Sequence, residues 1–254
     1  MVKVKLLDYT KNGPKLVYDY LKYLSYPEDL EKKLARPPTV EEMMELIIVR
    51  GYTTVLEHIN FTFLIEDMSM TVSREFLEHR LASHLGKSSR GFMKDWKFSY
   101  TVPARISKVG LGKMFRGAMN SADETFGKLT AAGIKKDDAR LVLPLATHCS
   151  YLWTINANAL INFLGLRLCP RSYIEIQQMA EQTYAQCLEV MPELFKFVGC
   201  RGVTMRLCPE GAARNSKSVP CPYKDPNSDV FIPTREDVGM PIPPRRSWIP
   251  VEWK

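Results

Sequence analysis

The segment 58–65, His-Ile-Asn-Phe-Thr-Phe-Leu-Ile, is the feature that most restricts the folds open to this chain. It is short and rich in β-branched and aromatic residues, which is typical of a buried β-strand. A helical pattern follows over about 69–83, and the alternating segment 2–7 precedes helical spacing over 14–24. We therefore predict an α+β fold, in which a small antiparallel sheet containing a strand at 56–67 is packed with long helices.

Several further segments have helical character. Thr39-Val40-Glu41-Glu42 matches a capping box and predicts a helix over 39–50. Further helices are expected over 108–132, 136–166 with an interruption near Pro144, and 172–191, and a short strand over 97–102.

The composition changes in the last fifth of the chain. Nine of the 46 residues between Pro209 and Lys254 are proline, which disfavours regular packed elements there. Val230, Phe231 and Ile232 supply apolar anchors in the same stretch. We therefore expect a single α+β domain over 1–208 and a Pro-rich, extended tail over 209–254 that lies across a neighbouring surface.

The charge balance favours a small anionic ligand. Thirty-five Lys and Arg face 28 Asp and Glu, giving a net charge of +7 that is spread along the chain without a block of like charges. That distribution indicates a phosphorylated substrate rather than a nucleic acid. No uninterrupted apolar run is long enough for a membrane span, and the N-terminus lacks the apolar region of a signal peptide. We expect a soluble, cytoplasmic protein with no membrane partner.

All six cysteines lie in the second half of the chain, and reduced thiols are the default in such a protein. The spacing Cys200-x7-Cys208-Pro-Glu-Gly, with Cys221 downstream, suggests a metal knuckle. However, there is no close Cys-x-x-Cys pair, and four-coordinate zinc would need a distant fourth ligand. From the sequence we favour structural or free thiols and expect no metal.

A helix end at Glu78-His79-Arg80 is followed by a loop rich in hydroxyl groups and positive charge. In that loop Ser88 supplies a hydroxyl and Arg90 a bidentate guanidinium, which together suit a phosphate or carboxylate. Taken alone, such a loop also fits an ordinary solvated surface.

Three blocks in order resemble one known family. The pattern Arg-His-Arg, seven residues, Ser-x-Arg is matched at His79, Arg80, Ser88 and Arg90. Segment 56–63 resembles the Glu-His-x-x-Phe-Thr-Phe strand of the same family, and the third block runs over 139–176. Over about residues 50–195 the chain resembles the flavin-dependent thymidylate synthases.

The resemblance implies a reaction and a set of roles. The family converts dUMP to dTMP, with NADPH reducing a bound FAD and methylenetetrahydrofolate giving the carbon, in a homotetramer whose sites are shared between subunits. The implied catalytic residues are Arg167, beside the pyrimidine, and His58, where flavin and folate stack. The implied substrate-binding residues are Ser88, Arg90, Arg140, Arg167 and Glu75. The implied cofactor-binding residues are His79, Arg80, Asn156, Asn158, Asn162 and Glu78. Without the resemblance, His58 would be read as a core histidine, Asn156 and Asn162 as interhelical contacts, and Arg140 as a surface charge.

The chain also departs from the family pattern. Glu78 replaces the first Arg of Arg-His-Arg, Glu75 replaces a Gln, Asn158 an Arg and Gly91 a Tyr. On a helix the pairs Arg74–Glu78 and Glu75–His79 are four residues apart, so these carboxylates are either neutralised internally or turned toward the pyrimidine. Three hypotheses follow: methylation of dUMP, one-carbon transfer to another pyrimidine nucleotide such as dCMP or UMP, and a non-catalytic nucleotide-binding protein.

Overall fold

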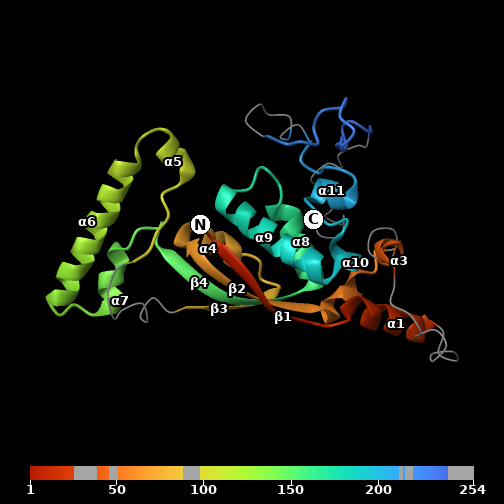
Figure 1. Cartoon of the computed structure of the whole chain (residues 1–254), viewed down its shortest axis with the longest axis horizontal. Coiled ribbons are helices and arrows are strands. Elements are labelled where there is room, and N and C mark those ends of the chain that lie inside the picture. The colour runs from red at the N-terminus through yellow and green to blue at the C-terminus, as the bar shows by residue number, and fades with distance from the viewer. Residues whose placement is uncertain (26–38, 46–50, 88–97, 212–213, 215–219, 240–254) are drawn as a thin grey trace, which may run out of the picture.

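A four-stranded antiparallel sheet forms the centre of the computed structural model, which describes residues 1–25, 39–45, 51–87, 98–211, 214 and 220–239 (Figure 1). Its strands are β1 (Lys3–Tyr9), β2 (Asn60–Ser69), β3 (Ala82–Gly86) and β4 (His148–Asn156), in the spatial order β1-β2-β4-β3. Helices gather on the sheet, so the predicted α+β class with a small antiparallel sheet is confirmed.

The alternation of β2 explains its central position. Phe61, Phe63 and Ile65 point to one face and are fully buried, whereas Thr62 and Leu64 point to the other face and are half-buried. In the pairing of β2 with β4, Phe63 lies opposite Trp153, and the two ring centroids are 5.5 Å apart. One face of the sheet therefore carries the aromatic core.

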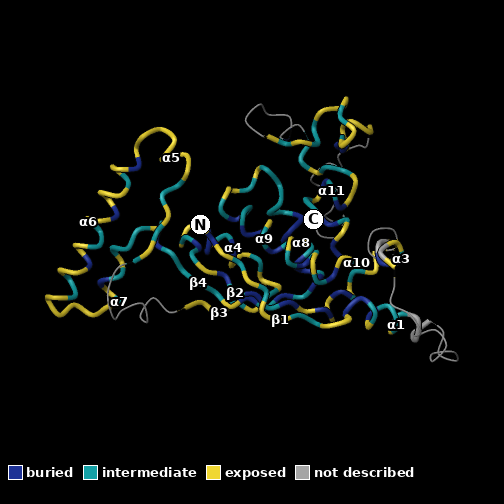
Figure 2. Tube along the Cα trace, viewed as in Figure 1, coloured by how far each residue is buried: buried dark blue, intermediate teal, exposed yellow. Residues whose placement is uncertain are grey.

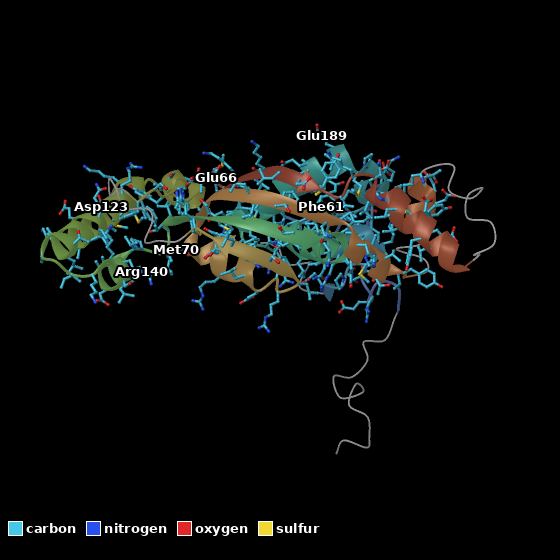
Figure 3. All side chains as sticks on the ribbon, turned by 90° about the horizontal axis from the view of Figure 1, so that it is seen from below. Phe61, Glu66, Met70, Asp123, Arg140 and Glu189 are labelled. Atoms are coloured by element: carbon cyan, nitrogen blue, oxygen red, sulfur yellow. The ribbon has the colours of Figure 1, made fainter. Side chains whose placement is uncertain are left out.

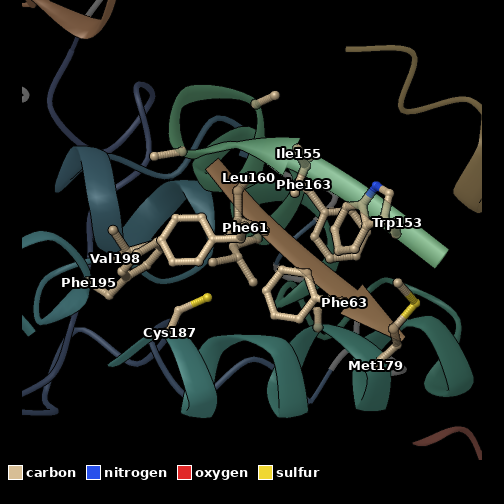
Figure 4. Close-up of a cluster of buried hydrophobic side chains, with 14 of the residues drawn as sticks. Phe61, Phe63, Trp153, Ile155, Leu160, Phe163, Met179, Cys187, Phe195 and Val198 are labelled. Carbon is tan, nitrogen blue, oxygen red and sulfur yellow. The ribbon is translucent and has the colours of Figure 1, made fainter. Parts of the chain in front are cut away.

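Two helices cover that face, α8 (Ala157–Arg167) and α9 (Ile174–Val190) (Figure 1). Figure 4 shows the resulting core, in which Phe61 and Phe63 of β2 and Trp153 of β4 face the side chains of Phe163 and Met179. Removing so many aromatic rings from water is the main favourable contribution to this packing.

The outer edge of the sheet is closed by α9. Two glutamine side chains of this helix, Gln182 and Gln186, accept from the N–H groups of Val4 and Leu6 at 3.0 and 2.6 Å. They donate to the carbonyls of Val2 and Val4 respectively. Because β1 is an edge strand, these contacts satisfy backbone groups that would otherwise be open to a foreign strand.

Shorter elements complete the sheet-containing part of the chain, hereafter the body. They are α1 (Gly13–Ser25), α3 (Val40–Met44), the 3₁₀ helix η3 (Thr53–His58), α4 (Met70–Leu77), α10 (Pro192–Phe195) and α11 (Arg201–Met205). The predicted capping box is confirmed at α3, where Thr39 and Glu42 bond reciprocally through side chain and backbone. The predicted end of that helix falls outside the described residues.

A helical hairpin extends from the body and comprises α5 (Ala104–Lys108), α6 (Gly112–Ala131), α7 (Lys136–Ala139) and the 3₁₀ helix η4 (Arg140–Val142) (Figure 1). It has a small core of its own around Phe126 and Ala139. Figure 2 shows that much of α6 is exposed. The predicted helix over 108–132 is interrupted because Gly110 takes a left-handed conformation with φ +79°.

The structure corrects three sequence-based boundaries. The helix predicted over 69–83 ends at Leu77, and 82–86 forms the edge strand β3. The strand predicted from residue 56 begins at Asn60, after a 3₁₀ helix. Within the helix predicted over 136–166, the segment His148–Asn156 is the strand β4. It is a strand because β2 and β3 pair with it on both sides, and that tertiary pairing overrides local propensity.

The described part of the C-terminal region packs without regular strands. Cys208 forms a single parallel bridge with Thr234, and its N–H donates to the carbonyl of Pro233 at 2.8 Å. Arg214 is only 3% exposed. Residues 240–254 fall outside the described chain, so the extended tail remains a prediction. Across the described ranges, none of the helices has both the length and the apolar character that crossing a bilayer requires.

Candidate functional site

A cavity of about 400 Å³ opens where the end of α4, the end of β4 and the helix α8 meet. It is lined by Glu78, His79, Arg80, Leu81, Ile155, Ala159, Asn162, Leu166 and Arg167. The wall therefore combines cationic, amide and carboxylate groups with aliphatic surface, which is typical of a site for an organic ligand with polar edges.

The junction of β4 and α8 positions one side of this cavity. The last residue of the strand, Asn156, is also the N-cap of the helix, and its side chain accepts from the N–H of Ala159 at 2.9 Å. This bond satisfies one of the free N–H groups at the helix start. Asn162 and Arg167 then follow on α8 and line the cavity.

Arg167 is held between two side chains, one from α4 and one from the turn after it. Its Nε donates to Nε2 of His79 at 2.9 Å, and its Nη1 forms an ion pair with Oε1 of Glu75. A guanidinium that donates in two directions has little rotational freedom, so its charge is fixed in direction as well as in place.

The environment of His79 keeps its imidazole neutral. Burial lowers the pKa of His79 to about 4, and the charges of Arg167 and, when protonated, His84 act in the same direction. Because Nε2 accepts from Arg167, the ring proton of the neutral form is assigned to Nδ1. The ring also packs edge-on against Phe163, with centroids 4.9 Å apart. His79 therefore orients Arg167 without adding a competing charge.

Five of the residues implied by the family resemblance line this cavity, namely Glu78, His79, Arg80, Asn162 and Arg167, and a sixth, Glu75, pairs with Arg167. They come from α4 and the turn after it and from α8, about ninety residues further along the chain. The predicted pairing of Glu75 with His79 is corrected, because Glu75 pairs with Arg167, which lies between them.

Other implied residues lie elsewhere. Asn156 is used as the helix cap, and Asn158 donates from Nδ2 to Glu57 at 3.2 Å. Arg140 belongs to η4 of the hairpin, where it pairs with Asp137 at 3.5 Å, and Figure 3 shows it at the hairpin end of the molecule. Ser88 and Arg90 lie outside the described residues.

His58 lines a second, larger cavity. It is the last residue of η3 and is exposed, so it is not the core histidine that the sequence alone indicates. The cavity has a volume of about 470 Å³ and is lined by Leu16, Val17, Tyr20, Thr54, Val55, Glu57 and His58. It is the more apolar of the two, because its lining, among the residues that the structure describes, includes Leu16, Val17 and Val55 and no arginine.

Sequence reasoning missed several lining residues, notably Leu81, Ile155 and Leu166. It also missed Arg201, the first residue of α11, whose guanidinium donates to Oδ1 of Asn162 at 3.2 Å. No local pattern marks these residues, since their role depends on the packing of α8 against β4 and α11.

With this geometry in view, the comparisons with known proteins are informative. The family model described as "Thymidylate synthase complementing protein" matches residues 5–193. The chain belongs to this family. The match includes most of the body, the whole hairpin and every residue that lines the 400 Å³ cavity, but not α11.

Proteins of this family named "Flavin-dependent thymidylate synthase" are similar over most of their length. The Clostridium tetani protein is 31% identical over 238 residues, which cover 86% of this chain and 94% of that protein. The Sulfurisphaera tokodaii protein is 34% identical over 202 residues, which cover 78% of each chain. A solved structure shares the fold, with a TM-score of 0.67 and 22% identity over 77% of this chain and 94% of that chain. It is described as a UMP/dUMP methylase PolB from Streptomyces cacaoi bound with 5-Br dUMP.

Proposed function

We propose that this protein methylates dUMP to dTMP in a flavin-dependent reaction, with methylenetetrahydrofolate as carbon donor and NADPH as reductant. Membership of the family and the names of its relatives support this activity. The structural observation that carries the proposal is Arg167, fixed between Glu75 and His79 in the wall of the 400 Å³ cavity.

Arg167 is suited to recognise and polarise a pyrimidine. A guanidinium has five N–H bonds, and the contacts to His79 and Glu75 use two of them, which leaves three for a ligand. The uracil ring of dUMP presents two carbonyl oxygens that accept such bonds. Because the guanidinium is already oriented, it can stabilise negative charge on the ring without reorganising during the reaction.

The rest of the wall fits FAD. Arg80 and Asn162 provide polar groups that suit the edge of a flavin ring, while Leu81, Ile155 and Leu166 provide apolar surface for its faces. When bound, FAD supplies the redox chemistry. The chain binds and orients, with His79 holding Arg167 and the aliphatic wall excluding water.

The nucleotide phosphate is assigned to Ser88, Arg90 and Arg140. Arg140 lies in the hairpin rather than at the cavity of the same chain, which supports a homotetramer with shared sites. The sheet face opposite the aromatic core also supports this assembly. On it Leu85 and Leu152 are paired across β3 and β4 and are 69% and 37% exposed. Apolar side chains in a row on an open sheet are typical of surfaces that another copy covers.

Transfer to dCMP or UMP is the alternative substrate choice. Glu75 would favour a cytosine amino group if its carboxylate faced the ligand, but its ion pair with Arg167 engages that carboxylate. This contact favours dUMP over dCMP. A purely nucleotide-binding role would need no oriented cation beside a flavin-sized cavity.

The decisive experiment is oxidation of the reduced, FAD-loaded protein by methylenetetrahydrofolate with dUMP, dCMP or UMP in turn, with product analysis. We expect dTMP formation with dUMP, and its loss in Arg167→Ala. The exposed Arg105, on α5, gives the matched control Arg105→Ala, which should retain activity. A colourless protein that takes up no FAD, or flavin oxidation only with another nucleotide, would contradict the proposal.

The assembly has its own measurement. Light scattering of the FAD-loaded protein should give a mass four times the 29.1 kDa of one chain. A monomer at micromolar concentration that still holds flavin would contradict the shared-site arrangement.

A further inference from the structure

Four of the six cysteines line one small cavity, although they lie far apart in the sequence. Cys169, Cys200, Cys208 and Cys221 line a space of about 20 Å³ beside α11. Such a volume is close to that of a single water molecule or ion. Cys149, on β4, and Cys187, in α9, lie elsewhere, and all six thiols are free.

The four cysteines are brought together by separate elements. Cys169 follows the end of α8, Cys200 is the N-cap of α11, and Cys208 is held by its bridge to Thr234. Gly202 of α11 lies against Cys208, because a Cβ placed on this glycine would be in ordinary van der Waals contact with Cβ of Cys208 at 3.4 Å.

The four thiols lie close enough to influence one another. Burial raises the pKa of Cys169 and Cys200, and the neighbouring cysteines raise it further because adjacent thiolates repel.

The cationic side chains of this region are already engaged. Arg171 forms an ion pair with Glu210, and both residues line the cavity. Arg214 is buried, donates to the carbonyls of Tyr223 and Ile232, and also acts on Cys208 by its charge. Both guanidinium groups are paired with carboxylates, Arg171 with Glu210 and Arg214 with Asp237, so they do not offset four thiolates, and the set would need a further cation from solution.

We propose that Cys169, Cys200, Cys208 and Cys221 bind one Zn²⁺ ion as a tetrahedral, four-thiolate structural site. Within the described ranges, no group of three or more His, Cys, Asp and Glu is already arranged to hold an ion. Closing the set around zinc, at about 2.3 Å from each sulfur, requires thiol side chains to rotate about their Cα–Cβ bonds. The cavity is too small for an iron–sulfur cluster, which favours a single ion.

This site answers the objection raised by the sequence. The knuckle-like spacing of Cys200, Cys208 and Cys221 lacked a fourth ligand, and we expected no metal. The fold provides Cys169, which lies 31 residues before Cys200 and two residues after Arg167.

A zinc ion here would be structural and would support the cavity described above. It would tie the end of α8 to the start of α11, whose first residue, Arg201, donates to Asn162. The C-terminal region would then be fastened to the helix that carries Arg167, without any zinc contact to a ligand in the cavity.

The first test is metal analysis of the full chain purified under reducing conditions without chelator. We expect one zinc per chain, and Co²⁺ in its place should give the visible absorption of a tetrahedral tetrathiolate. Cys208→Ser and Cys221→Ser should lose stoichiometric metal, whereas the matched control Cys149→Ser should retain it. A folded wild-type protein that takes up neither Zn²⁺ nor Co²⁺ would overturn the proposal.

The second test needs no variant and so does not depend on a mutant folding. Thiol alkylation followed by peptide mass spectrometry should find the four cysteines protected in the zinc-loaded protein and reactive after a chelator is added. The reactivity of Cys149 should not change. Protection that a chelator leaves intact, or disulfides among the four, would contradict zinc binding. Neither test depends on flavin or nucleotide binding.

Discussion

The body and the hairpin each carry a cation implied in nucleotide recognition, but they hold it in different ways. Arg167 in the body is fixed by Glu75 and His79, which come from another part of the chain and rest on the aromatic core. Arg140 in the hairpin pairs with Asp137, only three residues away. The orientation of Arg167 is thus a property of the folded body, whereas the position of Arg140 relative to any site depends on where the hairpin packs.

The largest effect should come from removing one core aromatic ring in each region. Phe163→Ala removes a fully buried ring that contacts Trp153 and His79, and should lower the free energy of unfolding by about 3–5 kcal/mol. Phe126→Ala should cost less, because it sits in a small cluster with Ala139. Denaturant unfolding and hydrogen exchange check this. Equal losses spread over the whole chain would show that the hairpin and body unfold as one unit.

The next effect separates the two cations by kinetics. Arg167→Ala should lower kcat about 100-fold or more, because it removes an oriented donor from the site. Arg140→Ala should instead weaken nucleotide binding by about 1.5–3 kcal/mol, the range for hydrogen bonds to charged groups, with kcat largely retained. We expect Arg90→Ala to behave like Arg140→Ala. Steady-state kinetics and nucleotide titration distinguish the cases, and unchanged affinity in both variants would remove the phosphate assignment.

A smaller effect should follow from restoring the family residue at the cavity mouth. Glu78 is exposed and lines the cavity, so Glu78→Arg changes the local charge by two units close to an anionic cofactor. The exposure limits the gain in FAD affinity to about 1 kcal/mol. Titration with FAD at low and high salt measures it. A matched change on the hairpin, Glu124→Arg, should leave FAD affinity unaltered. Identical behaviour of the two variants would place Glu78 outside the site.

The last effect concerns the pH dependence of stability. Burial holds the pKa of His79 at about 4 in the folded chain, below its unfolded value of about 6.5. As the pH falls, His79 is therefore protonated in the unfolded chain before it is protonated in the folded chain. Its contribution to the free energy of unfolding is complete above about pH 6.5 and is lost as the pH falls toward 4. The pKa values of His84 and His148 are lowered as well, so the measurement compares the wild type with His79→Gln. The free energy of unfolding of the variant should fall less steeply as the pH is lowered.

The hairpin supplies an internal reference for that measurement. None of the four histidines lies between residues 104 and 142. Hydrogen exchange of the hairpin amides, corrected for intrinsic rates, should stay constant between about pH 7 and 5.5, where only histidines titrate strongly. A parallel loss in both regions would mean that the acid effect does not arise at His79.

The predictable parts of this molecule are those with local signals. The strand around Phe61 and Phe63 and the capping box at Thr39 were predictable, because periodicity and spacing encode them directly. The strand β4 was not, since its partners are more than eighty residues away along the chain or separated by the hairpin. Its residues have no pattern that outweighs the helical segments on either side.

The candidate site likewise has parts that the sequence predicts and parts that it does not. Sequence resemblance identified His79, Arg80 and Arg167, but not the bond between His79 and Arg167 or the pairing of Glu75 with Arg167. The four cysteines gave no usable local spacing, because Cys169 joins the others only through the packing of α8 and α11. Contacts between distant segments are set by tertiary structure, and a single sequence does not encode them locally.

The direct passage from β4 to α8 couples two kinds of geometry. Asn156 ends the strand and Ala157 begins the helix, with no connecting residue between them. If β4 slipped by one position against β2, each residue of α8 would turn by about 100° around the helix axis. Arg167 would then no longer contact Glu75 and His79. The hydrogen-bond register of the sheet therefore sets the rotation of α8 about its own axis. In this way the pairing of the strands determines the direction in which Arg167 points, eleven residues after Asn156.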